Sequence, residues 1–492
     1  MPQPRGRERR GWFRWGMIGC LVCIAAGLAS AGTPASAQTL TEAFAYAYTN
    51  NPLLLAERAK LRAIDEQVPQ ALSNWRPTVN FTGSAGYSRG GFETPASPSA
   101  FGGGVCSNGA AAPVGTDCPT QFSNFIDKQL DLRVTQPIYR GGRTEAQTRQ
   151  AMNNVQSERA ATLGVETQVF QTVARAYLDV VRDQTLVEVA RNNEQVLKKQ
   201  LDATRDRFRV GEVTRTDVAQ AESSLAQATA QRINAEGQLE ASRAGYTHAV
   251  GHPPGRLVMP RERPVLPATR DEALSLAAHD NPTVIESSFA EMSARDNVAL
   301  VRGQLLPQVS IVGDLSRSYA PSFTLRNSRT DTASISAQVT VPLYEGGAVY
   351  SQTRAAEQAV GFQRSQLDDA RRTAVQNATA SWETLQAARA AIASFGAAVR
   401  AAQIALEGTQ QEALVGSRTV LDVLIAEQQL FTTQSQLVGA QHDAALQEFN
   451  LAAATGRLVA PELKLPVKLY DMDRHYRQVK DKWLGFGGGL KE

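Results

Sequence analysis

The sequence predicts an α+β membrane protein built from two copies of one unit, each with a short helical stretch, two β-strands and a long helical hairpin. Three observations support this prediction. Residues recur at constant offsets, four segments of about ten residues alternate apolar and small polar side chains, and two stretches of more than 110 residues contain no proline. With 42% hydrophobic and 20% charged residues among 492, the composition is that of a folded chain rather than a disordered one.

The first 37 residues have the pattern of a secretory signal peptide. Five arginines precede an apolar run from about Met17 to Leu28, and Ala35-Ser36-Ala37 resembles a cleavage site. A membrane anchor is the alternative, but the run is shorter than the roughly 20 residues that span a bilayer. Without residues 1–37 the chain has 46 basic and 47 acidic residues, so no basic excess indicates a nucleic-acid partner.

An exported chain of this kind retains two cysteines, Cys106 and Cys118. Exported proteins can enter an oxidising compartment, so we expect these two residues to form a disulfide. No run of about 18 apolar residues follows residue 37, and we therefore expect any membrane-spanning segments to be β-strands.

An internal duplication organises the chain. Residues before the strands recur with a shift of 230, and residues from the end of the second strand onward recur with a shift of 205. The matching pairs are Glu42-Ala43 with Glu272-Ala273, Asn51-Pro52 with Asn281-Pro282, Pro77 with Pro307, Pro137 with Pro342, Gly141-Gly142 with Gly346-Gly347, Val210-Gly211 with Val415-Gly416, and Asp217-Val218 with Asp422-Val423. The 25-residue difference lies between Pro77 and Pro137, in a Gly- and Ser-rich stretch that indicates a surface loop.

The duplication divides the chain into a signal peptide (1–37), a first repeat (38–260), a second repeat (261–457) and a C-terminal segment (458–492). We expect the C-terminal segment to wrap the middle of the helical part and to end in a disordered tail. Within the repeats we expect short helical stretches over about 40–75 and 270–306, β-hairpins over about 78–136 and 308–341, and long helical hairpins over about 143–250 and 348–453, with their tips at 209–217 and 414–422.

The β-segments begin where the short helical stretches end, at Pro77 and Pro307. From there one face is apolar and the other carries mostly Ser, Thr, Asn and Gln, which is typical of transmembrane β-strands. A soluble sandwich gives the same alternation, but nothing else in the chain supplies a second sheet. Strand-to-helix junctions are expected at Pro137 with Gly141 and Gly142, and at Pro342 with Gly346 and Gly347.

The proline-free stretches have coiled-coil spacing. Leu385, Ile392, Val399 and Leu406 repeat every seven residues. At 1.5 Å per residue, the arms over about 143–208 and 348–413 would each be about 100 Å long. Each stretch breaks once, at Val210-Gly211 or Val415-Gly416, where glycine suits a helix end, and a shorter helix then returns antiparallel.

The predicted elements require an oligomer. Spanning barrels have about eight or more strands, and an open sheet edge is unfavourable in lipid, so four strands cannot suffice alone. Both helix-to-strand junctions lie on the side opposite the cysteine loop. We therefore expect the loop to face outside and the helices to project into the periplasm.

The segment Val415-Gly416-Ser417-Arg418-Thr419-Val420-Leu421-Asp422-Val423-Leu424, together with the signal peptide and the two-copy plan, resembles the TolC family of outer-membrane export channels over about residues 38–470. The resemblance implies a homotrimer that forms one twelve-stranded β-barrel, four strands from each chain, continuing into a long periplasmic α-helical coiled-coil barrel. It implies an exit duct for type I protein secretion or tripartite drug efflux in the outer membrane of a Gram-negative bacterium. The resemblance further implies that this duct is passive and gated at its periplasmic tip.

The same resemblance implies the partners: outer-membrane lipid, a periplasmic adaptor (membrane fusion) protein, and an inner-membrane ABC or proton-driven transporter that supplies the energy. It implies no nucleic acid, cofactor or metal. An enzyme has little support, because the five histidines include no H-E-x-x-H and no lysine follows a glycine. The alternatives are a periplasmic coiled-coil adaptor, which should carry only one helical hairpin, and a surface stalk or adhesin, which should lack duplicated strands.

By resemblance the turns Val210–Asp217 and Val415–Asp422 form the periplasmic gate. Asp422 matches a position at which acidic residues ring the entrance, and three copies would attract cations. Helix N-caps are the alternative role for Asp422 and for its counterpart Asp217. Ile425 replaces the second acid of the best-known pattern.

Arg418 matches a family position that can bridge to the turn of the other repeat, with Thr216 and Asp217 as the partners. An exposed link of this kind contributes about 0–1 kcal/mol, which suits a gate that must open. A solvated arginine is the alternative. Ala413 stands where the family often has a tyrosine, so part of this lock is expected to be missing.

Overall fold

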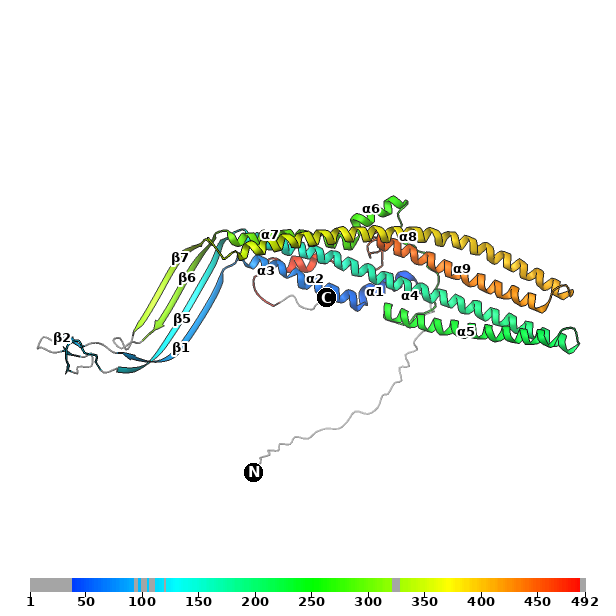
Figure 1. Ribbon diagram of the computed structural model, residues 1–492, viewed down its shortest axis with the longest axis horizontal. Helices are drawn as coiled ribbons and strands as arrows, with labels where there is room; N and C mark the ends of the chain where they lie inside the picture. The colour runs from blue at the N-terminus through cyan, green and yellow to red at the C-terminus, as the bar shows by residue number, and fades with distance from the viewer. Residues whose placement is uncertain are drawn as a thin grey trace, which may run out of the picture.

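The computed structural model describes residues 38–92, 96–98, 104–105, 111–118, 121–320 and 328–486. In this part the chain is a long rod of helices with a curved β-sheet at one end (Figure 1). The signal peptide expected over 1–37 and the last six residues of the tail lie outside the described residues.

The short helical stretch of each repeat is divided into separate helices. The first repeat has α1 (Leu40–Asn50), α2 (Pro52–Asp65) and α3 (Gln67–Ser73), and the second has α6 (Arg270–Asp280), α7 (Pro282–Arg302) and the 3₁₀ turn η1 (Gly303–Leu305). The first break follows from Asn-Pro: the Asn51 side chain accepts a hydrogen bond from the Leu53 backbone N–H at 3.0 Å, and Pro52 takes the first helical position. Asn281 and Pro282 do the same in the second repeat.

Four antiparallel strands form the large sheet in the order β1-β5-β6-β7: β1 (Thr78–Phe92), β5 (Gln121–Arg140), β6 (Gln308–Tyr319) and β7 (Arg329–Thr340). Within the described residues β1 and β7 each have one neighbouring strand, so they form the two edges of the sheet. The strand β5 continues past Pro137 through an irregularity between Pro137 and Tyr139. The first junction therefore begins later than expected, because Pro137 lies inside the strand rather than at its end.

The loop between β1 and β5 contains a second, small sheet. It consists of β2 (Ser97–Pro98), β3 (Gly104–Val105) and β4 (Ala111–Ala112). Cys118 beside it is buried and disulfide-bonded. The other residue of the expected pair, Cys106, lies outside the described residues.

The register of the large sheet gathers its apolar side chains on one face. Exposed Val79 lies opposite Val134, half-buried Leu132 lies opposite exposed Leu315, and the apolar face continues across the sheet to Ile335. The other face is polar, and there Arg133 Nε lies 3.2 Å from Asp314 Oδ2 on the neighbouring strand. One apolar and one polar face is the pattern of a membrane-spanning strand that borders a water-filled interior.

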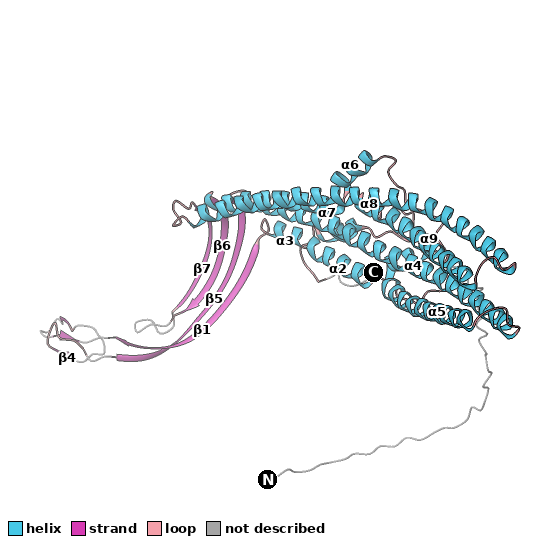
Figure 2. Cartoon of the chain, turned by 45° about the vertical axis from the view of Figure 1, so that its right-hand side comes forward, coloured by secondary structure: helices cyan, strands magenta, loops and turns pink. Residues whose placement is uncertain are grey.

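Four long helices form the rest of the rod: α4 (Arg143–Arg209), α5 (Arg215–Val250), α8 (Ala348–Leu414) and α9 (Val420–Ala454). They lie side by side in the order α5-α4-α9-α8 toward the tips (Figure 2). Nearer the sheet, α4 contacts α1, α2, α3 and α7, and α7 contacts α8. No helix in the described ranges is both long enough and apolar enough to cross a membrane.

The largest core lies where α1, α4, α5 and α9 meet the C-terminal segment. Phe170, Tyr177 and Tyr246 are fully buried there, together with Leu458. The C-terminal segment is fixed by polar contacts as well, since the Ala460 backbone N–H donates to the buried Glu166 carboxylate at 2.6 Å. Its last helix, α10 (Met472–Val479), packs against α2.

Candidate functional site

The candidate site is the end of the rod farthest from the sheet. There α4 turns into α5 through residues 209–217, the first tip, and α8 turns into α9 through residues 414–422, the second tip. Gly211 and Gly416 have φ of +82° and +81°, the left-handed conformation that ends a helix. In each tip the next backbone N–H bonds back at 3.0 Å, from Glu212 to the Arg207 carbonyl and from Ser417 to the Glu412 carbonyl. Val210 and Val415 are both largely exposed.

The two acidic residues belong to capping boxes. Thr419, not Asp422, is the N-cap of α9: its hydroxyl accepts from the Asp422 backbone N–H at 3.3 Å. The Asp422 carboxylate accepts in return from the Thr419 backbone N–H at 2.9 Å and from its hydroxyl at 2.8 Å. Thr214 and Asp217 repeat this arrangement at α5. The alternative prediction, that Asp422 and Asp217 are themselves the N-caps, is therefore wrong, because each acid occupies the third position of its helix.

Hydrogen bonds from the Thr419 backbone and hydroxyl lower the pKa of Asp422, and the Arg418 charge adds to the effect. Asp422 is half-buried and keeps its negative charge at neutral pH. Thr216, on the first turn of α5, is exposed.

The expected bridge from Arg418 to Thr216 and Asp217 does not form in the described chain. Arg418 Nε lies 2.9 Å from Glu412 Oε2, so the ion pair closes the second tip on itself. The chain reverses between these two residues, and the arginine side chain therefore faces the last turn of α8. In the first tip Arg207 Nε and Glu212 Oε2, 3.0 Å apart, close the turn with the charges in the opposite order.

An apolar cluster holds the two tips together. Val420 and Leu424 of α9 pack against Leu197 and Leu201 of α4, with two alanines of α5 completing the contact. The heptad spacing of the sequence does not identify this contact, because a heptad indicates a buried face and not which helix covers it. Ala413 is buried with Leu406 and Val423, and Ile425 is 59% exposed.

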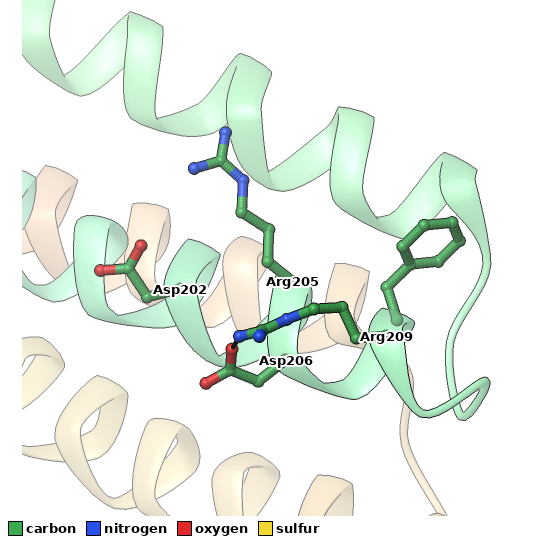
Figure 3. Close-up of a pocket in the computed structure, with 5 residues that line it drawn as sticks. Asp202, Arg205, Asp206 and Arg209 are labelled. Carbon is green, nitrogen blue, oxygen red and sulfur yellow. Dashed lines mark hydrogen bonds and ion pairs between the residues drawn. The ribbon is translucent and has the colours of Figure 1, made fainter.

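A groove of about 470 Å³ lies beside the first tip (Figure 3). Both of its arginines are paired: Arg205 Nη2 lies 2.6 Å from Glu222 Oε1, and Arg209 forms an ion pair with Asp206. The Phe208 ring is 44% exposed at the same place. The groove therefore combines charges of both signs with one accessible aromatic ring. It is lined by Asp202, Arg205, Asp206, Phe208 and Arg209.

Farther from the tips, a buried histidine joins the two repeats. His442 of α9 has its Nε2 2.9 Å from Asp179 Oδ1 of α4 and its Nδ1 2.9 Å from Asp443 Oδ1. Arg182 of α4 also contacts Asp179, at 3.0 Å, and pairs with Asp183. Burial alone would lower the pKa of His442, but hydrogen bonds to Asp179 and Asp443 outweigh burial and raise it.

We expect the stability contribution of His442 to depend on pH. Because its folded-state pKa is raised, the contribution is complete below the unfolded pKa of about 6.5 and is lost as the pH rises through the folded value. His442→Gln should therefore lower the apparent melting temperature of the purified protein more at about pH 6 than at about pH 8.5. His279→Gln, on the exposed surface of α6, is the matched control and should show no such difference. An equal effect of His442→Gln at both pH values would contradict the expectation.

Comparisons with known proteins agree with this architecture. Residues 45–252 and 273–457 match the sequence model of the family described as "Outer membrane efflux protein". The chain is 32% identical to the outer membrane efflux protein BepC of Brucella suis, over 94% of this chain and 95% of the relative, and 27% identical to the outer membrane protein TolC of Vibrio cholerae, over 88% and 94%. The crystal structure of VceC, an outer membrane protein of Vibrio cholerae, superimposes with a TM-score of 0.70 at 21% identity, covering 85% of this chain and 96% of that one. The chain therefore belongs to the outer membrane efflux protein family and is an outer-membrane channel of the TolC type.

Proposed function

We propose that three copies of the chain share one pore, which runs from an entrance at the tips to an exit through the β-sheet end. The observation that carries the proposal is the four-stranded sheet with β1 and β7 at its edges and one continuous apolar face. In lipid an unpaired strand edge is costly, and pairing β7 of one copy with β1 of the next removes every edge. Three copies then give twelve strands, which is consistent with the trimeric channels of this fold.

The helical part supports the same closure. The helices lie in the order α5-α4-α9-α8, so α5 and α8 form the two flanks of the layer toward the tips. Large apolar side chains are exposed on these flanks, as expected of surfaces that another copy covers. They are Ile233 on α5 and Phe362, Ile404 and Leu414 on α8.

The tips are proposed as the gate. Each copy brings Asp217 and Asp422 to one end of the rod, so a trimer concentrates six carboxylates around its axis. The capping boxes fix the carboxylates in position, and the lowered pKa of Asp422 keeps that group charged. A ring of fixed negative charge at a constriction favours cations. Arg418 pairs with Glu412 of its own hairpin and does not join the two hairpins. Within one chain, the contacts that must change when the gate opens are therefore the apolar contacts of Val420 and Leu424 with α4.

The partners follow from the tip surface. The groove beside Phe208 offers paired charges and an accessible ring, which suits the helical end of a periplasmic adaptor rather than a small ligand. The transporter of the inner membrane, ABC-type or proton-driven, would supply the energy and the cargo.

The described residues contain no group of His, Cys, Asp and Glu that could hold a metal ion. A coiled-coil adaptor or a poreless adhesin does not agree with membership of a channel family.

Single-channel recording tests the gate. We expect the purified oligomer to conduct ions in a planar bilayer with a preference for cations, and Asp422→Asn to reduce that preference roughly two- to tenfold because the ring loses half its charge. Asp271→Asn removes the same charge from α6, an exposed helix away from the tips, and is the matched control. If Asp422→Asn leaves the cation preference unchanged, the entrance is not at the second tip.

A further inference from the structure

The C-terminal end of the described chain returns to the junction between the helices and the sheet. After α10, the backbone passes Arg76, whose guanidinium donates to the Lys482 carbonyl at 2.7 Å. The same guanidinium lies over the Trp483 ring, 4.7 Å from its centroid. Because β1 begins at Thr78, two residues after Arg76, Trp483 lies at the level where the sheet starts.

This segment is attached firmly through α10. Arg159 of α4 lies 2.6 Å from Asp473, and His475 lies 3.1 Å from the buried carboxylate of Asp65. Val479 at the end of the helix is buried. In Figure 1, α10 is the red helix that lies alongside α2. The segment that follows is therefore held at one place on the rod rather than free to move along it.

Beyond this attachment the apolar side chains are largely exposed. Trp483, Leu484 and Phe486 are 65%, 90% and 109% exposed. Aromatic side chains of this size contribute mainly through the area they bury, and a short exposed cluster of them indicates a surface that something else covers.

The surroundings indicate what covers them. The apolar face of β1 begins at Val79, and it continues with Phe81. Exposed aromatic side chains lie at the same junction on other elements, Trp75 before β1 and Tyr139 near the end of β5. Membrane barrels carry such aromatic girdles where the hydrocarbon meets the headgroups.

The charge of the region agrees with a phospholipid surface. Arg76, Lys480 and Lys482 bring three positive charges beside the exposed rings, against the single acid Asp481 between the lysines. Basic residues next to tryptophan suit the phosphate level of a bilayer.

We propose that residues 482–486 form an interfacial anchor, which inserts Trp483, Leu484 and Phe486 into the phospholipid leaflet that faces the periplasm. The anchor rests on the membrane placement of the strands proposed above. It ties the end of the C-terminal segment, and through α10 the part of the rod near the sheet, to the membrane surface. This contact, which lies outside the barrel itself, thereby fixes the orientation of the rod and its tips relative to the membrane.

Tryptophan fluorescence tests the anchor in the whole protein. Without residues 1–37 the chain has three tryptophans, Trp75, Trp382 and Trp483. The oligomer is inserted into vesicles of phosphatidylethanolamine and phosphatidylglycerol, with or without bromine on the acyl chains. Subtracting the emission of Trp483→Phe from that of the unaltered protein gives the share of Trp483. We expect brominated lipid to quench about half of this share or more, and less than about a tenth of the share of Trp382, obtained with Trp382→Phe.

Three outcomes would overturn the anchor. A Trp483 share that iodide quenches and brominated lipid does not would place the ring in water. A share that neither reagent quenches would place it against a second copy. If the protein and its Trp483→Phe variant fail to float with the vesicles, the membrane placement of the strands fails together with the anchor. In the first two cases, normal flotation shows that the anchor alone is overturned.

Discussion

Gly141→Ala should prevent the first strand-to-helix junction from forming as observed. Gly141 has φ of +65°, and a Cβ there would lie 2.3 Å from the Gly303 carbonyl oxygen and 2.8 Å from Leu306 Cβ. The left-handed conformation alone costs alanine about 1–2 kcal/mol, and the backbone contact raises the loss to roughly 3 kcal/mol or more per chain. We expect most of the assembled oligomer to disappear from the outer membrane, measured by immunoblotting of membrane fractions.

The second repeat supplies the control. Gly346 is the residue that corresponds to Gly141 after the shift of 205, and its φ is +63°. No atom lies within 4 Å of the position of its Cβ. Gly346→Ala should therefore carry only the backbone strain and leave more than half of the oligomer intact. Equal losses in the two variants would show that the close approach to Gly303 does not matter.

Ile335→Lys should block membrane assembly. Ile335 is 86% exposed in the middle of β7, on the apolar face of the sheet, where it lies opposite Gly313. A lysine on the lipid side of a barrel costs about 2–4 kcal/mol at the bilayer midplane, and a trimer carries three copies of the substitution. The expected result is loss of the heat-modifiable oligomer from membranes, measured by electrophoresis with and without boiling.

Ser336→Lys is the matched control for the sheet. Ser336 is the next residue of the same strand, so its side chain points to the polar face, which borders the proposed pore. We expect the oligomer to assemble and its cation preference to fall. If Ser336→Lys blocked assembly and Ile335→Lys did not, the lipid-facing side of the sheet would have been assigned in reverse.

The sequence predicted the helices well because their signals are local. The arm expected over about 143–208 is Arg143–Arg209, since a heptad pattern, a Gly-Gly start and a Val-Gly stop all lie within it. The strands were harder to delimit. Residues Gln121 to Gln129 belong to β5, but Asp127 and Lys128 interrupt the alternation and the neighbouring loop is rich in Gly and Ser.

The contacts of the site were less predictable than its location. The repeat placed both tips, because the glycine and the acid keep their spacing in each copy. Sequence spacing could not show that Arg418 faces Glu412. The two side chains meet because the left-handed conformation of Gly416 reverses the chain between them. The cluster of Val420 and Leu424 with Leu197 and Leu201 joins segments more than 200 residues apart, and one sequence contains no signal for that pairing.

The central claim is that three copies share one pore whose entrance lies at the tips. Single-channel recording of oligomers assembled from equal amounts of unaltered and Asp422→Asn chains tests it most directly. A shared trimeric pore predicts four classes of cation preference, for none, one, two or three altered copies, in proportions of about 1:3:3:1. Two classes only, each identical to one of the pure proteins, would mean that every chain forms its own pore, and would contradict the claim.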